Sequence, residues 1–486
     1  MTTAQTRPPL VALAIALAVA LLATPLAGVD ASPPTEDEFV VGYDARRIVA
    51  GEIPFRDFHA VEPPAGILLH AALYRVVGPS QLASRLVALW LGALGALLAF
   101  VVVSRAGGTR LAAAIAAVAS AAPLWLWPYP TPHGAALVVA LAALATALAG
   151  RFAVAGALVA TAGLFYPAVG VAAAVGVAVL AAHGRTRAIW LHALAGAALV
   201  VAALALWLAA HGALASAARA MAWPLSHYNR ARGFNDVGFA AGLGRTVSAT
   251  RAAAGPVAAA ACVLVGFTVA ALALVGPALL LPAAAIARRR RGPAAATELA
   301  LAAAGATLTL LALVQRPDIV HLGFAAALII PAAACRRSPL IGRLAMALTY
   351  GAAVGVAVLA VTRALAAPLP PRFDTVVARW PAVVDIRAVT REGDRIAVLP
   401  AGGFYYAYAR PAAIGYSWLL PPRARYHDAS DYDRVADELA GARAVFFTSL
   451  DDERDFAEHA GRLSAVLARD FHPVVTPAGS RAWLRR

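Results

Sequence analysis

The sequence predicts an α-helical membrane protein with about 11 transmembrane helices and a small C-terminal α/β domain outside the membrane. Of its 486 residues, 61% are hydrophobic and 14% are charged, whereas soluble domains carry about 25% charged residues. Apolar runs near the length of about 20 residues that a membrane-crossing helix needs recur up to residue 362. Beyond residue 363 the apolar runs become short and alternate with polar stretches, as in a globular domain.

The first apolar run extends from Leu10 to about Gly28. The hydrophobic core of a signal peptide spans about 7–15 residues, so this longer run favours an uncleaved first span. The small residues around Asp30-Ala31-Ser32 resemble a cleavage site, and cleavage therefore stays open as the alternative.

Ten further apolar runs predict the remaining spans. They lie at residues 81–104, 110–127, 134–149, 152–166, 167–182, 188–210, 256–286, 296–314, 318–334 and 340–362. The third to fifth of these runs are short and are separated by proline or by Gly150-Arg151, which favours broken or re-entrant helices.

Arginines at alternate ends of the runs predict the orientation of the chain. These residues are Arg7, Arg105, Arg110, Arg151, Arg185, Arg187, Arg288 to Arg291, Arg336 and Arg337. Short basic loops mark the cytoplasmic side, and this placement explains the net charge of +15 without a nucleic-acid partner. The outer face of the inner (cell) membrane then receives the first outer loop at 29–80, the loops at 127–133 and 165–167, the long segment 211–255, the turn at 315–321 and the C-terminal domain.

We therefore expect a transmembrane domain over residues 1–362 and an extracytoplasmic α/β domain over 363–486. In the latter, 396–399 and 444–447 are expected to be strands, and 431–440 and 452–469 are expected to be helices. Ala401-Gly402-Gly403 lacks the remaining residues of a phosphate-binding loop.

The first outer loop concentrates the polar residues that the apolar spans lack. Apolar positions at helical spacing predict a helix over 38–50, lying along the membrane interface with Arg46 and the Asp37 end facing water or a cavity. A second apolar helix is expected over 65–77. Adjacent residues on a helix point in different directions, so Asp37 and Glu38 cannot serve one site equally.

Several motifs of this loop occur in a recognisable order. They are Asp37-Glu38, Ala45-Arg46-Arg47, the run Gly51 to Phe58, Pro63-Pro64-Ala65-Gly66 and Gly78-Pro79-Ser80. Over residues 30–105 this order resembles polytopic GT-C glycosyltransferases of the protein mannosyltransferase and lipid A aminoarabinose transferase kind, a family 39-type group. Gln315-Arg316-Pro317-Asp318 with His321 is similar to a short outer loop of bacterial members. The chain departs at Phe39 and Asp44, where members often carry a small residue and alanine, and this leaves subfamily and substrate open.

The resemblance implies transfer of a sugar from a polyprenyl-phosphate donor to a hydroxyl of a lipid, glycan or protein acceptor. It implies that Asp37 is the catalytic base, with Glu38 in support, and that Arg316, Asp318 and His321 serve the leaving phosphate. Arg46 or Arg47 would be secondary candidates for stabilising the same phosphate. Asp57 and His59 are candidates for orienting sugar hydroxyls or a divalent metal ion, and the sequence assigns no metal ligand.

Each assignment has a structural alternative. Asp37 could instead cap the helix that follows it. Arg316 could extend its charged end from a span to the membrane surface, and His321 could be a histidine of the membrane interface. Asp57 could form an ion pair with Arg56 within a turn. A transporter or flippase of a lipid-linked envelope precursor would need polar residues inside the spans, where the sequence has almost none. A catalytically silent membrane scaffold is the third alternative.

Overall fold

A computed structural model describes most of the chain. The described residues are 36–60, 62–123, 131–184, 186–227, 239–288, 293–315, 318–335, 339–366, 377–477 and 481–486, with Ala14 and Ala18. The chain divides into two compact units, one of Met1–Val29, Arg85–Leu204 and Val237–Pro370, the other of Asp30–Ser84, Ala205–Asp236 and Pro371–Arg486. The expected first span, Leu10 to Gly28, lies outside the described residues.

All ten of the other apolar runs contain helices. These helices are α4 (Gln81–Arg105), α5 (Arg110–Ala119), α7 (Pro132–Leu148), α8 (Phe152–Phe165), α9 (Pro167–Gly184), α10 (Arg187–Ala210), α13 (Phe239–Arg288), α14 (Pro293–Gln315), α15 (Ile319–Cys335) and α16 (Pro339–Ala366). Six of the described helices are long and apolar enough to cross a membrane, and α5, α7, α8 and α15 are shorter apolar helices. The chain is therefore a multi-pass membrane protein.

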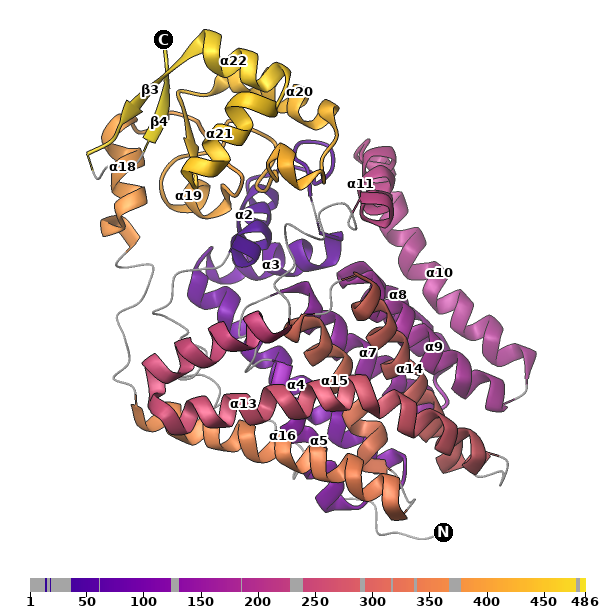
Figure 1. Cartoon of the computed structure of the whole chain (residues 1–486). Helices are drawn as coiled ribbons and strands as arrows, with labels where there is room; N and C mark the ends of the chain where they lie inside the picture. Colours follow the sequence, from indigo (N-terminus) through magenta and orange to yellow (C-terminus); the bar gives the residue numbers. More distant parts are fainter. Residues whose placement is uncertain are drawn as a thin grey trace. The chain divides into compact units, whose positions relative to one another are not determined.

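Helix α13 begins well before the expected residue 256 because two helical segments join at Gly255. Gly255 has φ 82° and ψ −177°, a conformation that glycine adopts without steric cost. The following Pro256 disfavours a helical conformation at the residue before it, which accounts for the break at this position. Beyond the break, α13 packs along α16 and against α14 and α15 (Figure 1).

Glycines let α8 and α10 approach closely. A Cβ atom on Gly156 would lie 1.8 Å from the carbonyl oxygen of Ala193, and one on Gly196 would lie 1.9 Å from that of Ala153. The two helices thus meet backbone to backbone, as small residues permit between membrane helices.

The two predicted helices of the first outer loop are present as α2 (Glu36–Val49) and α3 (Pro64–Val77). The apolar face of α2, expected against the membrane interface, is covered by protein instead, because Val41 is 1% exposed and Ala45 is fully buried. A Cβ atom on Gly42 would lie 3.2 Å from the Tyr74 hydroxyl of α3. On other sides α2 is covered by the C-terminal residues of the same unit, so its apolar stripe faces protein.

The C-terminal domain holds one four-stranded sheet in the order β1-β2-β4-β3. Its strands are β1 (Ile396–Leu399), β2 (Ala444–Phe447), β3 (Phe471–Val475) and β4 (Arg481–Arg485). β1 and β2 are parallel and the other pairs are antiparallel. The two predicted strands are confirmed, whereas β3 and β4 were not predicted.

Five α-helices accompany the sheet. They are α18 (Pro381–Val389), α19 (Gly403–Tyr408), α20 (Ala429–Glu438), α21 (Leu450–His459) and α22 (Arg462–Asp470). The single helix expected over 452–469 is two helices, because Gly461 adopts φ 54° between them. Fully buried Val435, Phe456 and Leu467 connect α20, α21 and α22 to the core of the domain.

Candidate functional site

Three acidic residues, Glu36, Asp37 and Glu38, occupy the first turn of α2. The partial positive charge of a helix N-terminus stabilises ionised carboxylates and so keeps acids at this position deprotonated. Glu38 is buried, at 3% exposure. The structure describes the helical backbone of Asp37 and not its side chain, so its catalytic role stays a prediction.

Arg46 connects α2 to α19. Its Nη1 donates a hydrogen bond of 2.9 Å to the Ala407 carbonyl oxygen, and its guanidinium lies 5.2 Å from the centre of the Tyr408 ring. A Cβ atom on Gly403 would lie 2.6 Å from the Phe39 carbonyl oxygen. The glycine is therefore needed for the approach of α19 to α2, and Arg46, expected at the lipid phosphate, contributes to the same packing.

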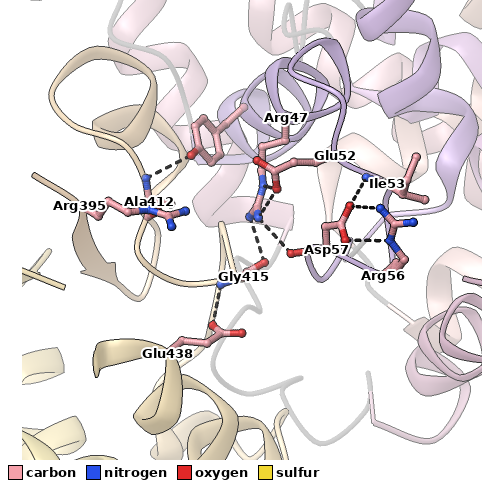
Figure 2. A network of polar contacts seen from close by, with 10 residues as sticks. Arg47, Glu52, Ile53, Arg56, Asp57, Arg395, Ala412, Gly415 and Glu438 are labelled. Carbon is pink, nitrogen blue, oxygen red and sulfur yellow. Dashed lines mark hydrogen bonds and ion pairs between the residues drawn. The ribbon is translucent and has the colours of Figure 1, made fainter. Parts of the chain in front are cut away.

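Arg47 organises the loop that follows α2 (Figure 2). Its Nη2 lies 2.6 Å from a carboxylate oxygen of Glu52 and donates to the Asp57 carbonyl oxygen at 3.1 Å. Its Nη1 donates to the Gly415 carbonyl oxygen at 3.4 Å, and its guanidinium lies over the Phe58 ring at 4.6 Å. This buried arginine, a secondary candidate in the sequence, thereby holds the loop on the C-terminal domain.

The side chain of Asp57 is held within its own turn. It forms an ion pair of 2.8 Å with Arg56 and accepts a hydrogen bond of 2.7 Å from the Ile53 N–H. The bond from Arg56 holds the pKa of this carboxyl below its usual range. This geometry agrees with the turn ion pair considered as the alternative.

His59 lies in an aromatic cluster. Its ring stacks on Tyr416 with centroids 4.7 Å apart, and its backbone N–H donates to the Gly415 carbonyl oxygen. Burial lowers the pKa of His59 to about 4, so the ring is neutral near pH 7. Within the described part of the chain, no three His, Cys, Asp or Glu residues gather closely enough to hold a metal ion.

In the other unit, Asp318 and His321 lie together at the start of α15. One carboxylate oxygen of Asp318 accepts hydrogen bonds from the backbone N–H groups of Val320 and His321, as a helix cap does. The same oxygen lies 2.8 Å from Nδ1 of His321. This contact orients the imidazole and directs its Nε2 away from the carboxylate.

His133 and Tyr166 complete a cluster that the sequence analysis did not assign. The His133 ring centroid lies 4.1 Å from that of Tyr166, 5.4 Å from that of His321 and 5.4 Å from that of Phe324. Helices α7, α9 and α15 all begin at this cluster. Pro132 and Pro167 at two helix starts, both on predicted outer loops, were the available signal. The predicted Arg316 lies outside the described residues.

The N-termini of α7 and α9, together with two histidines and a tyrosine, form an environment suited to an anion, whereas the N–H groups of Val320 and His321 at the start of α15 are already bonded to Asp318. Unpaired backbone N–H groups and the helix dipole favour negative charge at such ends. A phenol can donate to a phosphate oxygen, and Nε2 of His321 can do so when the imidazole is protonated, because Nδ1 already faces the Asp318 carboxylate. The arrangement therefore fits the expected role of His321.

Comparison with solved structures defines the fold. ArnT from Cupriavidus metallidurans, solved bound to undecaprenyl phosphate, matches with a TM-score of 0.54 and 15% identity over 98% of this chain and 97% of that chain. This chain has a GT-C-like fold. The Archaeoglobus fulgidus oligosaccharyltransferase tethered to an acceptor peptide matches with a TM-score of 0.53 and 14% identity, over 98% of this chain and 74% of that one.

The GT-C-like fold is supported by structure alone at these low identities. No protein-family model matches the sequence. No curated protein matches it either. The oligosaccharyltransferase has also been solved with an inhibitory peptide and dolichol-phosphate, at a TM-score of 0.51 and 14% identity over 98% of this chain and 74% of that chain.

Proposed function

We propose that this protein is a membrane glycosyltransferase that uses a polyprenyl-phosphate-linked sugar. The observation that carries the proposal is the match over nearly the whole chain to ArnT, which was solved with undecaprenyl phosphate. The match to an oligosaccharyltransferase solved with dolichol-phosphate supports the same donor class. The acid-rich first turn of α2, which carries the motif resemblance, adds support from the chain itself.

The proposed chemistry requires one base and one anion site. The acceptor hydroxyl oxygen forms a bond to the anomeric carbon while the bond from that carbon to the phosphate oxygen breaks. The hydroxyl proton passes to the Asp37 carboxylate, and polyprenyl phosphate leaves with the bonding electron pair. A positioned base of this kind contributes about 10²–10⁴-fold to the rate.

We assign binding of the leaving phosphate to the cluster at the starts of α7, α9 and α15. His321, oriented by Asp318, presents Nε2 as a hydrogen-bond partner, and His133 and Tyr166 lie against the same ring. Arg316, two residues before Asp318, would add a permanent positive charge. A donor phosphate gains negative charge as the bond breaks, and groups of this kind stabilise that charge.

The sequence motifs narrow the proposal to enzymes similar to protein mannosyltransferases and aminoarabinose transferases. Transfer would take place at the outer face of the inner membrane, with the C-terminal domain extracytoplasmic, as the arginine pattern predicts. The acceptor would be a lipid, glycan or protein hydroxyl. A divalent metal ion stays open, and no step above depends on it.

The test is sugar transfer from radiolabelled polyprenyl-phosphate donors by the full-length protein in liposomes. We expect Asp37→Asn to reduce transfer at least 100-fold, since asparagine cannot accept the proton. Glu36→Gln is the matched control, because it removes one negative charge from the same helical turn, and it is expected to retain most activity. Full activity of Asp37→Asn would remove the base assignment, and no transfer by the native protein with any donor would favour a scaffold.

A further inference from the structure

Asp44 is a buried carboxyl group in the middle of α2. The residue is fully buried, and neither of its carboxylate oxygens has a hydrogen-bond partner among the described residues. Ser417, in the C-terminal segment that covers α2, is 1% exposed, and its hydroxyl also has no partner of normal geometry in that set. A buried ionised carboxylate without partners is costly, so the group must be neutralised or the surrounding contact must change.

The neighbouring arginine does not supply that neutralisation directly. Arg47 follows Asp44 by three residues, but its guanidinium is engaged by Glu52, Asp57 and Gly415. Burial raises the pKa of Asp44 to about 7, while the charge of Arg47 and the nearby Ser417 hydroxyl act in the opposite direction. The negative charge of Glu52 adds to the rise.

Other titratable groups surround this part of α2 without pairing with the carboxyl. They are Tyr43 of α2 with Tyr406 of α19 against its ring, Tyr74 of α3 with its hydroxyl beside Gly42, and Tyr408 of α19 against Arg46. The charges that act on Asp44 are those of Arg47 and Glu52. The net charge at this contact therefore changes when Asp44 gains or loses its proton.

We propose that Asp44 is a proton-operated latch between the first outer loop and the C-terminal domain. With its proton in place, the carboxyl donates a hydrogen bond to Ser417 and α2 stays seated against the segment 412–418. When the proton leaves, a negative charge is isolated in the contact and α2 loosens from that segment. The external pH then sets how firmly the two segments are joined.

The direction of the pH effect follows from proton linkage. Asp44 binds its proton more tightly in the closed contact than in the open chain, where its value is 3.8. Closure is therefore most favoured below about pH 4, weakens up to tenfold per pH unit between about 4 and 7, and becomes insensitive to this group above about pH 7. The total change is about a thousandfold in the closure equilibrium.

The test is amide hydrogen exchange of the full-length protein in lipid nanodiscs at pH 5.5 and pH 8, corrected for intrinsic exchange rates. In the native protein, peptides from α2 and from 412–418 are expected to lose at least tenfold protection at pH 8. Asp44→Asn, which resembles the protonated side chain in shape and charge, should keep high protection at both values. Asp437→Asn, which removes an exposed carboxylate paired with Arg462, should behave like the native protein.

Equal pH sensitivity of the native protein and Asp44→Asn would overturn the latch, as would weaker protection of Asp44→Asn at both values. If Asp44→Asn fails to fold, Ser417→Ala provides the second test, since loss of the acceptor should reduce protection at pH 5.5 more than at pH 8. Because α2 also carries Asp37, the latch would influence sugar transfer, a consequence that rests on the proposed function. The exchange measurement itself needs no activity, so it can fail or succeed independently.

Discussion

Replacing Arg47 with methionine should weaken the attachment of the first outer loop to the C-terminal domain. Methionine keeps the length of the side chain and removes every hydrogen bond of the guanidinium. The lost contacts are the ion pair with Glu52, the bond to the Asp57 carbonyl oxygen at 3.1 Å and the longer one to Gly415 at 3.4 Å. The Asp57 carbonyl oxygen would then lose its charged donor, while the Gly415 carbonyl oxygen would keep its bond from the His59 N–H (Figure 2).

The size of the effect follows from burial. Hydrogen bonds to charged groups contribute about 1.5–3 kcal/mol each. The side chain of Arg47 is 8% exposed but that of Glu52 is 36% exposed, so solvent screens the ion pair and its share is discounted. The 3.4 Å bond is weak. We therefore expect a loss of about 3 kcal/mol, which lowers Tm by about 6–12 °C in a unit of 150–250 residues.

The assay is thermal unfolding of the detergent-solubilised protein at pH 5.5. At this pH Asp44 is mostly protonated, because burial raises its pKa to about 7. Arg56→Met is the matched control, because Arg56 is 47% exposed and its ion pair with Asp57 should contribute under about 1 kcal/mol. Hydrogen exchange of residues 51–60 and 412–418 locates the change. Equal Tm losses for the two variants, or a loss below about 1 kcal/mol for Arg47→Met, would refute the reasoning.

Two further substitutions test separate contacts. Gly403→Ala places a Cβ atom 2.6 Å from the Phe39 carbonyl oxygen, so we expect a loss of about 1–3 kcal/mol and faster amide exchange in α2. Gly441→Ala has open space around its Cβ and should change Tm little; similar losses in both would contradict this. Asp318→Asn keeps an acceptor for the α15 N-terminus but removes the charge beside His321. We expect KM for the lipid-phosphate donor to rise several-fold with little change in Tm, and an unchanged KM would separate this pair from donor binding.

The helices could be predicted from the sequence because each depends on local composition. Run length placed the ten helices found in the apolar runs, and apolar spacing placed α2 and α3. What covers those helices could not be predicted in the same way. The apolar positions of α2 suit a membrane surface and a protein surface equally, and the bond from Arg46 to Ala407 joins residues 361 positions apart. No local pattern specifies contacts of that separation.

For the candidate site, too, the sequence predicted the positions of residues along the chain but not the contacts between their side chains. The predicted topology placed His133, Tyr166 and His321 on the outer face of the membrane, because each lies in a loop on that side. The contacts between their rings depend on how α7, α9 and α15 pack. Asp44 stood out in the sequence as a departure from the related loops. Its consequence, a buried carboxyl without a partner in the described structure, required the covering segment with Ser417.

Because Asp44 and Asp37 lie on the same helix, a change at Asp44 can affect the N-terminal turn of α2 that carries Asp37. A helix of 14 residues is about 21 Å long and moves largely as one body. Positions 37 and 44 are two turns apart and differ by only about 20° around the axis, so they belong to one stripe of the helix. Phe39, Tyr43 and Arg46, which contact the C-terminal domain, fix the rotation of that stripe. The rotation of α2 is therefore set by contacts with residues 403–418, and a charge that appears or disappears at Asp44 acts on the same helix.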